Sequence, residues 1–410
     1  MNRILITNAK GLVQYGRSSI VKGKSMAHLP VLENSWVLIE GDKIHSYGHM
    51  DEMIHTSVNE VIDASGCYVM PSWCDSHTHI VFAGSREREF VDRVHGLTYE
   101  EIANRGGGIL NSAKRLQQTS EEELFDAAWL RLDDMKRSGT GAVEIKSGYG
   151  LTLEAELKML KVIRRLKETS PLTIKATFLG AHAMPSEFKE NRNGYIDLLV
   201  NVMLPEIAAH GLADFNDVFC DRGFFTVDET DRILDAGNKL GIPPKIHANE
   251  LDFSGGIQVG VKHHALSVDH LEFTGDEEIK ILAASQTMPT LLPSTAFFLK
   301  IHYPPARKMI DAGLPVALAS DYNPGSSPSG KMSFVLSLAC LYLGMDPEEA
   351  INAATLNGAY AMNVMEELGS IVPGKKANLF ITKPIASLAY LPYAFTSNLT
   401  DKVFINGKLQ

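Results

Sequence analysis

Two histidines separated by one residue, His77 and His79, follow an apolar segment that has the composition of a β-strand. Side chains two positions apart in a strand point to the same side, so both imidazoles can bind one ion. A single His-x-His pair is more often an ordinary packed pair, but His247 and Asp321 also follow apolar segments directly. Three neutral imidazoles and one carboxylate suit Zn²⁺ or iron. We therefore predict a site for one Zn²⁺ or Fe³⁺ per chain, where the ion activates a water molecule.

Two further polar residues follow predicted strands without being needed as ligands. Glu250 comes three residues after His247, and His270 ends another apolar segment. These side chains are free for proton transfer and for polarising a carbonyl group, so we predict Glu250, His270 and Asp321 as the catalytic residues. The alternatives are a carboxylate at a helix start for Glu250 and a partner of a metal ligand for His270. The sequence leaves open whether Asp321 or Glu250 takes the first proton.

Two loops and one arginine complete the set of candidates. Arg86 lies seven residues beyond His79, and its planar guanidinium suits a carboxylate, although a surface ion pair with Glu87 or Glu89 is the alternative. The glycine-rich segment at residues 105–108 lacks the Gly-Lys-Ser/Thr of a phosphate-binding loop, which favours a connection near the site. The turn-rich segment at residues 321–326 is either a plain loop or a wall of the substrate site.

The elements that must position these residues alternate between apolar strands and amphipathic helices. Capping-box patterns open several of the helices: Ser120 with Glu123, Thr226 with Glu229, and Thr274 with Glu277. The eight strand candidates are Tyr68–Asp75, Gly141–Lys146, Thr173–Leu179, Asp217–Cys220, Lys245–Ala248, Leu266–Asp269, Met288–Leu292 and Val316–Ser320.

Eight strands with intervening helices predict a (β/α)8 barrel, whose active sites lie at the carboxyl ends of the strands. Five of the 14 histidines fall at these ends, which agrees with a site there. An open doubly wound sheet is the alternative, but no Gly-x-Gly-x-x-Gly follows the first strand. Short strands are also predicted near both termini: Arg3–Thr7, Trp36–Glu40, Lys43–Tyr47, Asn378–Thr382 and Val403–Ile405, the last closed by the hairpin signal Asn406-Gly407.

Composition limits the classes of partner. The net charge of −10 and the absence of a run of lysines and arginines argue against nucleic acid and anionic membranes as partners. The apolar segment Phe334–Leu343 is too short to span a bilayer and predicts a buried helix. No secretory signal is expected, and four scattered cysteines without Cys-x-x-Cys spacing favour reduced thiols in a cytoplasmic protein. The oligomeric state, including a homodimer, stays open.

With His77 and His79 after the first predicted strand, His247 at the end of the fifth, His270 after the sixth and Asp321 after the eighth, the chain resembles the amidohydrolase superfamily over essentially its full length. The resemblance implies a metal-binding (β/α)8 barrel at residues 67–362 and a small β-sandwich built from residues 1–66 and 363–410. The fourth strand ends at Cys220 and Asp221, without the lysine that is carboxylated to bridge two metals in binuclear members. The resemblance therefore implies a mononuclear site.

Several ungapped stretches extend the resemblance to members that open the ring of 4-imidazolone-5-propionate during histidine degradation, giving N-formimino-L-glutamate. These stretches are His77–Arg86, Glu89–Phe90, Gly106–Ile109, Ser147–Leu151, Phe178–Ala183, Asp269–Glu272 and Ser320–Ser326. Residue by residue, they imply that the metal ligands are His77, His79, His247 and Asp321. The implied contacts to this small-molecule substrate are Arg86, Tyr149, His182, Glu250, Asn323, Gly325 and Ser326.

The implied reaction is hydrolysis of the cyclic amide by activated water, with His270 stabilising the oxyanion. One rival is a mononuclear deaminase of a nucleobase-like ring, but Arg86, Tyr149 and His182 suit a substrate with a carboxylate. The other rival is a non-catalytic scaffold with the same fold, which the retention of every implied ligand disfavours.

Overall fold

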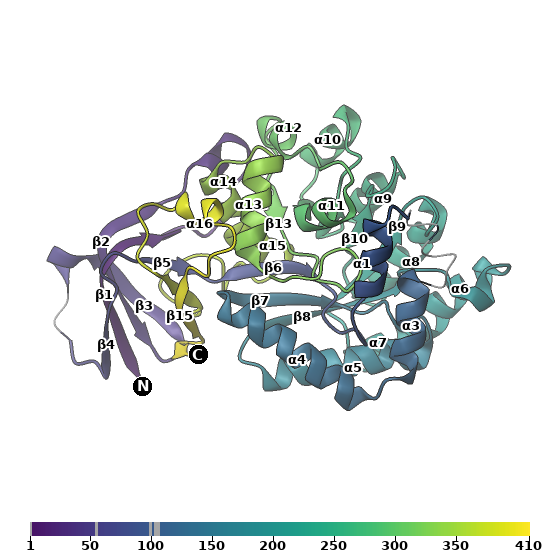
Figure 1. Cartoon of the computed structure of the whole chain (residues 1–410), viewed down its shortest axis with the longest axis horizontal. Helices are drawn as coiled ribbons and strands as arrows, with labels where there is room; N and C mark the ends of the chain where they lie inside the picture. The colour runs from purple at the N-terminus through teal and green to yellow at the C-terminus, as the bar shows by residue number, and fades with distance from the viewer. Residues whose placement is uncertain (1, 54–55, 98–100, 102–106) are drawn as a thin grey trace.

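The molecule consists of two parts, each built on an eight-stranded sheet. The computed structural model describes residues 2–53, 56–97, 101 and 107–410. Figure 1 shows the two parts side by side, with both chain termini in the smaller one. Of the glycine-rich segment predicted to lie near the site, only Gly107 and Gly108 are among the described residues.

The smaller part takes strands from both ends of the chain. Its strand order is β16-β15-β14-β5-β1-β2-β3, and β4 pairs with β1. The Ala377 N–H donates to the Asp42 carbonyl (2.8 Å), so the β2–β3 turn lies against the start of β14 and the sheet encloses an apolar interior. The predicted Asn406-Gly407 hairpin is present, since β15 and β16 pair antiparallel. The strands are β1 (Arg3–Val13), β2 (Val31–Glu40), β3 (Lys43–His49), β4 (Glu60–Asp63), β5 (Tyr68–Pro71), β14 (Leu379–Thr382), β15 (Thr400–Ile405) and β16 (Lys408–Leu409).

The larger part is the predicted (β/α)8 barrel. Its eight strands pair in parallel, each with its neighbours in sequence, which rules out the doubly wound alternative. The first and last strands meet just beyond β13, where the Asp321 N–H donates to the His77 carbonyl (3.0 Å) and the His79 N–H to the Tyr322 carbonyl (2.9 Å). The strands are β6 (Trp73–Thr78), β7 (Thr140–Lys146), β8 (Thr173–Ala181), β9 (Phe215–Cys220), β10 (Ile246–Ala248), β11 (Ser267–His270), β12 (Met288–Leu291) and β13 (Ala317–Leu318).

Helices connect the barrel strands, and Figure 1 shows them around the outside of the sheet. The α-helices are α1 (Glu87–Val94), α3 (Gly108–Gln118), α4 (Glu121–Arg137), α5 (Leu153–Thr169), α6 (Arg192–Leu198), α7 (Leu204–Ala209), α8 (Val227–Lys239), α9 (Gly256–Lys262), α10 (Asp276–Ala283), α11 (Pro293–Leu299), α12 (Ala306–Asp311), α13 (Met332–Tyr342), α14 (Pro347–Asn352), α15 (Gly358–Ala361) and α16 (Tyr390–Tyr393). Shorter 3₁₀ and π segments are η1 (Gly23–Ala27), η2 (Met50–Glu52), η3 (Ser186–Phe188), η4 (Leu199–Met203) and η5 (Ala353–Asn357). None of the helices in the described ranges is long and apolar enough to cross a membrane.

The capping-box predictions hold for two helices and fail for a third. Ser120 and Thr226 cap α4 and α8 as predicted, each in a reciprocal pair with the glutamate three residues on. The box predicted at Thr274 is wrong by one position, because α10 starts after Gly275, whose N–H donates to the Glu278 carboxylate (2.9 Å). The Thr274 hydroxyl instead donates to the Leu271 carbonyl (2.8 Å).

The first predicted barrel strand, Tyr68–Asp75, is in fact two strands in different sheets. β5 pairs with β1 and β14 of the terminal sheet, whereas β6 pairs with β7 of the barrel. The change of partner occurs at one peptide: the Ser72 N–H donates to the Asn378 carbonyl (3.0 Å) and the Trp73 N–H to the Gly139 carbonyl (3.0 Å). The apolar run is continuous because both strands are buried, which hides the junction in the sequence.

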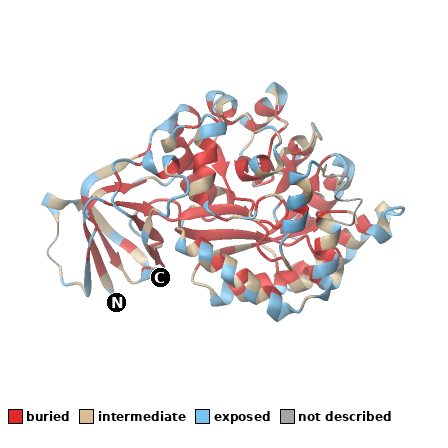
Figure 2. Cartoon of the chain, in the orientation of Figure 1, coloured by how far each residue is buried: buried red, intermediate tan, exposed pale blue. Residues whose placement is uncertain are grey.

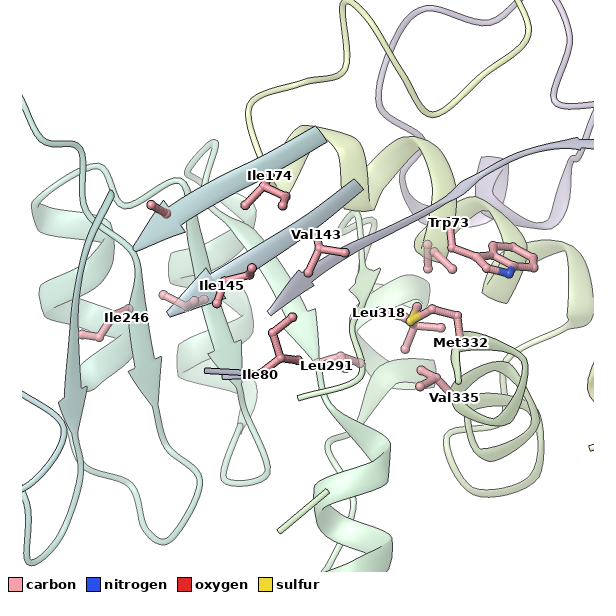
Figure 3. Close-up of a cluster of buried hydrophobic side chains, with 14 of the residues drawn as sticks. Trp73, Ile80, Val143, Ile145, Ile174, Ile246, Leu291, Leu318, Met332 and Val335 are labelled. Carbon is pink, nitrogen blue, oxygen red and sulfur yellow. The ribbon is translucent and has the colours of Figure 1, made fainter. Parts of the chain in front are cut away.

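One apolar cluster links the barrel strands to the helices around them. Figure 3 shows its members on strands, such as Val143 and Ile246, and on α13, such as Met332 and Val335. Figure 2 shows the barrel strands largely buried, while exposed residues lie on the outer helical faces, in loops and on strands such as β4 and β16 of the smaller part. The helix predicted at Phe334–Leu343 packs into this cluster on one side, but Leu341 is exposed on the other.

Phe380 of β14 tests how far the terminal sheet stabilises the barrel. Its buried ring lies 5.0 Å from the ring of Trp73 on β6, so it joins the two parts. We expect Phe380→Ala to lower the free energy of unfolding in urea by about 3–5 kcal/mol, because it leaves a cavity at the junction. Phe395→Ala is the matched control, since Phe395 is 51% exposed. Equal effects of the two changes would show that the junction adds little stability.

Candidate active site

Three buried histidines converge at the carboxyl ends of β6 and β10. The Nε2 atom of His79 lies 3.2 Å from Nε2 of His77 and 3.5 Å from Nε2 of His247. One carboxylate oxygen of Asp321 lies 3.5 Å from Nε2 of both His77 and His79. Burial lowers the pKa of His77 and of His79 well below the usual value, which keeps both rings neutral and able to coordinate. This donor set fits a single metal ion, since the ligand nitrogens of the three histidines all lie within 4.8 Å of one another.

Two aspartates orient the rings. His77 Nδ1 donates to Asp269 Oδ2 (2.6 Å), and His247 Nδ1 donates to Asp217 Oδ1 (3.0 Å). Because the outer nitrogen of each ring carries the hydrogen, the Nε2 lone pair faces the centre of the site. These are the carboxylate–histidine pairs that metal-binding imidazoles usually make.

Asp321 is held by its backbone and its side chain. Its backbone lies in the left-handed region (φ 53°), where the chain turns out of the barrel wall directly after β13. The Thr295 hydroxyl at the start of α11 donates to Asp321 Oδ2 (2.5 Å). This hydrogen bond occupies one carboxylate oxygen and leaves the other facing the histidines.

Three titratable side chains, those of Glu250, His270 and Glu272, form a cluster beside the three histidines. Glu250 Oε2 is 3.7 Å from His270 Nε2, and Glu272 Oε2 is 3.8 Å from His270 Nδ1. Burial raises the pKa of Glu250 to about 8, although His270 opposes this. Burial also lowers the pKa of His270, but the carboxylates of Glu250, Glu272 and Asp321 outweigh it and raise that pKa to about 10. The raised pKa of Glu250 lies close to neutral pH, which suits a group that takes up and returns a proton, and the raised pKa of His270 keeps its ring protonated.

A cavity of about 680 Å³ opens onto these residues. Its apolar walls come mainly from α1, from α11 with the segment that follows it, and from the loop after β9. The predicted substrate contacts and catalytic groups all line it: Arg86, Tyr149, His182, Glu250, His270, Asp321, Asn323, Gly325 and Ser326. His79 and His247 also face the cavity, whereas His77 lies behind them.

Arg86 presents its guanidinium to the cavity. Its Nε donates to the Ser112 hydroxyl on α3 (2.8 Å), while its buried Nη2 has no hydrogen-bond partner in the described part of the chain. No ion pair joins Arg86 to Glu87 or Glu89 there, so the surface-pair alternative does not apply; Glu89 instead accepts from the Gly108 N–H (3.0 Å). The guanidinium carbon lies 5.7 Å from the centre of the Tyr149 ring.

The loop after β13 is folded around Asn323. Its side-chain oxygen accepts from the N–H groups of Gly325 (2.7 Å) and Ser326 (2.8 Å), and its Nδ2 donates to the Asp321 carbonyl (2.7 Å). A Cβ at Gly325 would lie 2.3 Å from Arg86 Nη1, so glycine leaves the room that the guanidinium occupies. The turn-rich segment is therefore a wall of the cavity.

His182 and Tyr149 form the side of the cavity next to the histidines. The rings of His182 and His79 stack with centroids 5.3 Å apart, and His182 Nδ1 donates to the Gly148 carbonyl (3.0 Å). Burial lowers the pKa of His182 to about 3, so its ring is neutral. Its Nε2 consequently is a hydrogen-bond acceptor for a ligand N–H.

The sequence interpretation missed the residues that hold the site from behind. Asp217 and Asp269 lie in predicted strands that are otherwise mostly apolar. An aspartate in such a strand could have indicated a buried partner for one of the histidines. Thr295 and Ser112 carry no such signal, since hydroxyl groups at or on helices are common. Their roles depend on which strand or loop packs opposite them.

The sequence model of the amidohydrolase family matches residues 68–409, and the chain belongs to this family. It is 58% identical over 407 residues to imidazolonepropionase from Flavobacterium johnsoniae, covering 99% of each chain. It is 45% identical over 417 residues to imidazolonepropionase from Geobacillus kaustophilus, covering 100% of this chain and 98% of that one. The solved structure of Escherichia coli guanine deaminase has a similar fold, with a TM-score of 0.75, 13% identity, and 100% and 99% of the two chains covered.

The donor set predicts one metal ion per chain. Elemental analysis of the purified protein should give about one equivalent of zinc or iron, because β9 ends in Cys220 and Asp221 without a bridging lysine. His77→Ala should abolish metal retention and leave the circular dichroism spectrum of a folded barrel. His210→Ala, a change to an exposed histidine, is the control and should retain the metal. Two equivalents, both required for activity, would contradict the mononuclear site.

Proposed function

We propose that this protein hydrolyses the cyclic amide of 4-imidazolone-5-propionate to N-formimino-L-glutamate, a step of histidine degradation. The observation that carries the proposal is Arg86, whose Nη2 has no partner among the described residues and which lines the same cavity as His79 and His247. A substrate for such a cavity has a carboxylate at one end and a hydrolysable group at the other. Similarity to the imidazolonepropionases over nearly the whole chain supports this choice.

The metal ligands in this proposal are His77, His79, His247 and Asp321, holding one Zn²⁺ or Fe³⁺. Nitrogen and carboxylate donors suit either ion. A metal ion held by these four residues would supply Lewis acidity, which would lower the pKa of a bound water and polarise the carbonyl group to be attacked. The aspartates behind His77 and His247 keep the two rings in the coordinating tautomer.

Substrate binding is divided between the two ends of the cavity. Arg86 forms a pair of hydrogen bonds with the propionate carboxylate through its two terminal nitrogens. Its Nε is already bonded to Ser112, which fixes the orientation of the guanidinium in the cavity. Tyr149 and His182 contact the ring, and the accepting Nε2 of His182 suits a ring N–H. The remaining wall is Asn323, Gly325 and Ser326, and Glu250 contacts the ring on the catalytic side.

In the reaction, water adds to the ring carbonyl carbon and the bond between that carbon and the ring nitrogen breaks. Glu250 or Asp321 accepts the proton that water loses. His270, held in its protonated form by the carboxylates around it, stabilises the negative charge that develops on the carbonyl oxygen. The carboxyl group that received the proton then gives it to the departing nitrogen, so the carbon becomes the new carboxylate and the nitrogen becomes part of the formimino group.

A cytoplasmic location is part of the proposal. Cys67, Cys74, Cys220 and Cys340 are all free thiols, as expected in a reducing compartment. The partner is a small molecule and not a nucleic acid or membrane surface, in line with the net charge of −10. A homodimer stays an open alternative.

Arg86→Met tests the substrate assignment. The loss of one partner of a buried charged pair costs about 2–5 kcal/mol, so kcat/KM for imidazolone propionate should fall by about 30- to several-thousand-fold. KM should rise most, with a smaller fall in kcat, because the propionate is remote from the bond that breaks. The readout is steady-state turnover of this substrate beside an imidazolone that lacks the carboxylate.

Arg88→Met is the control for that change, since Arg88 is exposed on α1, which begins directly after Arg86, and does not line the cavity. Wild type and Arg88→Met should prefer the intact substrate, and Arg86→Met should lose the preference. An unchanged preference in Arg86→Met would remove Arg86 from substrate binding. Failure of the wild type to open imidazolone propionate would overturn the proposed function itself.

Glu250→Gln tests the proton-transfer role. Glutamine keeps the shape of the side chain but cannot accept a proton, so kcat should fall by about 10²- to 10⁴-fold. Metal content should stay unchanged. Glu277→Gln, at an exposed position on α10, is the control and should retain wild-type kcat. A near-normal kcat with a raised KM in Glu250→Gln would leave Glu250 as a binding residue and Asp321 as the base.

A further inference from the structure

Five charged side chains lie inside the barrel directly behind the proposed metal site, and the proposed function gives a role to only two of them, the aspartates that orient His77 and His247. They come from four strands or strand edges and are all 0% exposed: Glu144, Lys146, Asp217, Lys245 and Asp269. Buried charges are costly unless each is paired, so the arrangement of the pairs indicates what the cluster stabilises.

Lys146 lies between the two aspartates that orient the histidines. Its Nζ is 2.6 Å from Asp217 Oδ2 and 3.5 Å from Asp269 Oδ2. Asp217 uses its other oxygen to accept from His247 Nδ1, and Asp269 uses Oδ2 to accept from His77 Nδ1. One ammonium group at the end of β7 therefore contacts the partners of two rings that arrive on β6 and β10.

We propose that Lys146 is a positioning residue for the metal centre, which holds Asp217 and Asp269 in the orientation that directs His247 and His77 toward the ion. This inference rests on the metal site of the proposed function. Without the ammonium, two like charges would face each other in a site that excludes water, and each carboxylate would turn away from the other. The hydrogen bonds to the two Nδ1 atoms would then lose their geometry, and the Nε2 atoms would no longer converge.

Lys245 provides an internal comparison within the same cluster. Its Nζ contacts the second carboxylate oxygen of Glu144 and donates to the carbonyls of Ser76 (3.0 Å) and Ala361 (3.2 Å). Glu144 also pairs with Lys146 (2.7 Å), so the two lysines share one partner. Lys245 has no described contact with Asp217 or Asp269. Removing either lysine therefore removes one buried positive charge, but only Lys146 touches the partners of the histidines.

The test compares Lys146→Met with Lys245→Met by metal affinity, measured without substrate. Each protein is stripped of metal and titrated with Zn²⁺ against a chromophoric chelator. Loss of a residue that orients a metal ligand typically weakens binding by about 10- to 100-fold. Because Lys146 holds two such residues, we expect a loss on this scale for Lys146→Met but not for Lys245→Met. The visible absorption of the Co²⁺-substituted protein should change in intensity and position in Lys146→Met only, because it reports ligand geometry.

Equal affinity losses in the two variants, or wild-type affinity in Lys146→Met, would overturn the inference. Either result is independent of the proposed function, which depends on turnover of imidazolone propionate by the wild type.

If Lys146→Met does not fold, Ser267→Ala answers the same question with a smaller change. The Ser267 hydroxyl donates to Asp269 Oδ1 (2.5 Å). Its loss removes one hydrogen bond that holds Asp269 in place and leaves every buried charge with its partner. Zn²⁺ affinity should fall by about tenfold, the low end for such residues. Ser337→Ala is the matched control, because the buried Ser337 hydroxyl donates to the Ser333 and Pro392 carbonyls, away from the barrel interior. Wild-type affinity in a folded Ser267→Ala protein would contradict the role of the cluster.

Discussion

The hydrogen bonds from histidine Nδ1 atoms to buried aspartates are the interactions on which the rest of the site depends. Asp269 and Asp217 each fix one imidazole so that its other nitrogen faces the same point. A carboxylate in this position can stay charged only where another group balances it, and Lys146 lies within 3.5 Å of both. The positions of Asp217, Asp269 and Lys146 must therefore be as precise as those of the histidines. All three residues lie on strands of the barrel and not on loops.

The barrel topology brings these residues together without long connecting segments. Parallel strands place all their carboxyl ends at one rim, so residues widely separated in sequence meet without long connections. The charged cluster, the proposed metal ligands and the proposed substrate-binding arginine then lie at three successive depths of the barrel. The charged cluster occupies the barrel interior, the histidines lie above it, and Arg86 comes from a connection at the rim, where α3 supplies its partner Ser112. The five charged side chains of the cluster are fully buried, which strengthens the electrostatic contacts among them.

Much of this could be predicted from the sequence, for a physical reason. Strand ends are marked by a change from apolar to polar residues, and His77, His247 and Asp321 stand at such changes, so the fold class and the central residues could be inferred together. The sheet exchange at Ser72 could not be predicted, because both strands are buried and the apolar run does not break there. The helix start at Gly275 depends on a backbone N–H that no side-chain pattern reveals. Lys146 gave no signal at all: a lysine near the end of a strand is usually solvated, and its buried partners Asp217 and Asp269 lie on two other strands, β9 and β11.

The seam of the barrel has a consequence for how the protein is made. Its first and last strands join through contacts such as Ser320 to Asp75, which span 245 residues of sequence, and the proposed ligands lie on both sides of that seam. A chain emerging from the ribosome carries His77 and His79 early but lacks Asp321 until the last strand has been synthesised. Until then the nascent protein has an incomplete set of donors and an open rim. The complete set of four proposed ligands therefore exists only once the last strand has closed the barrel.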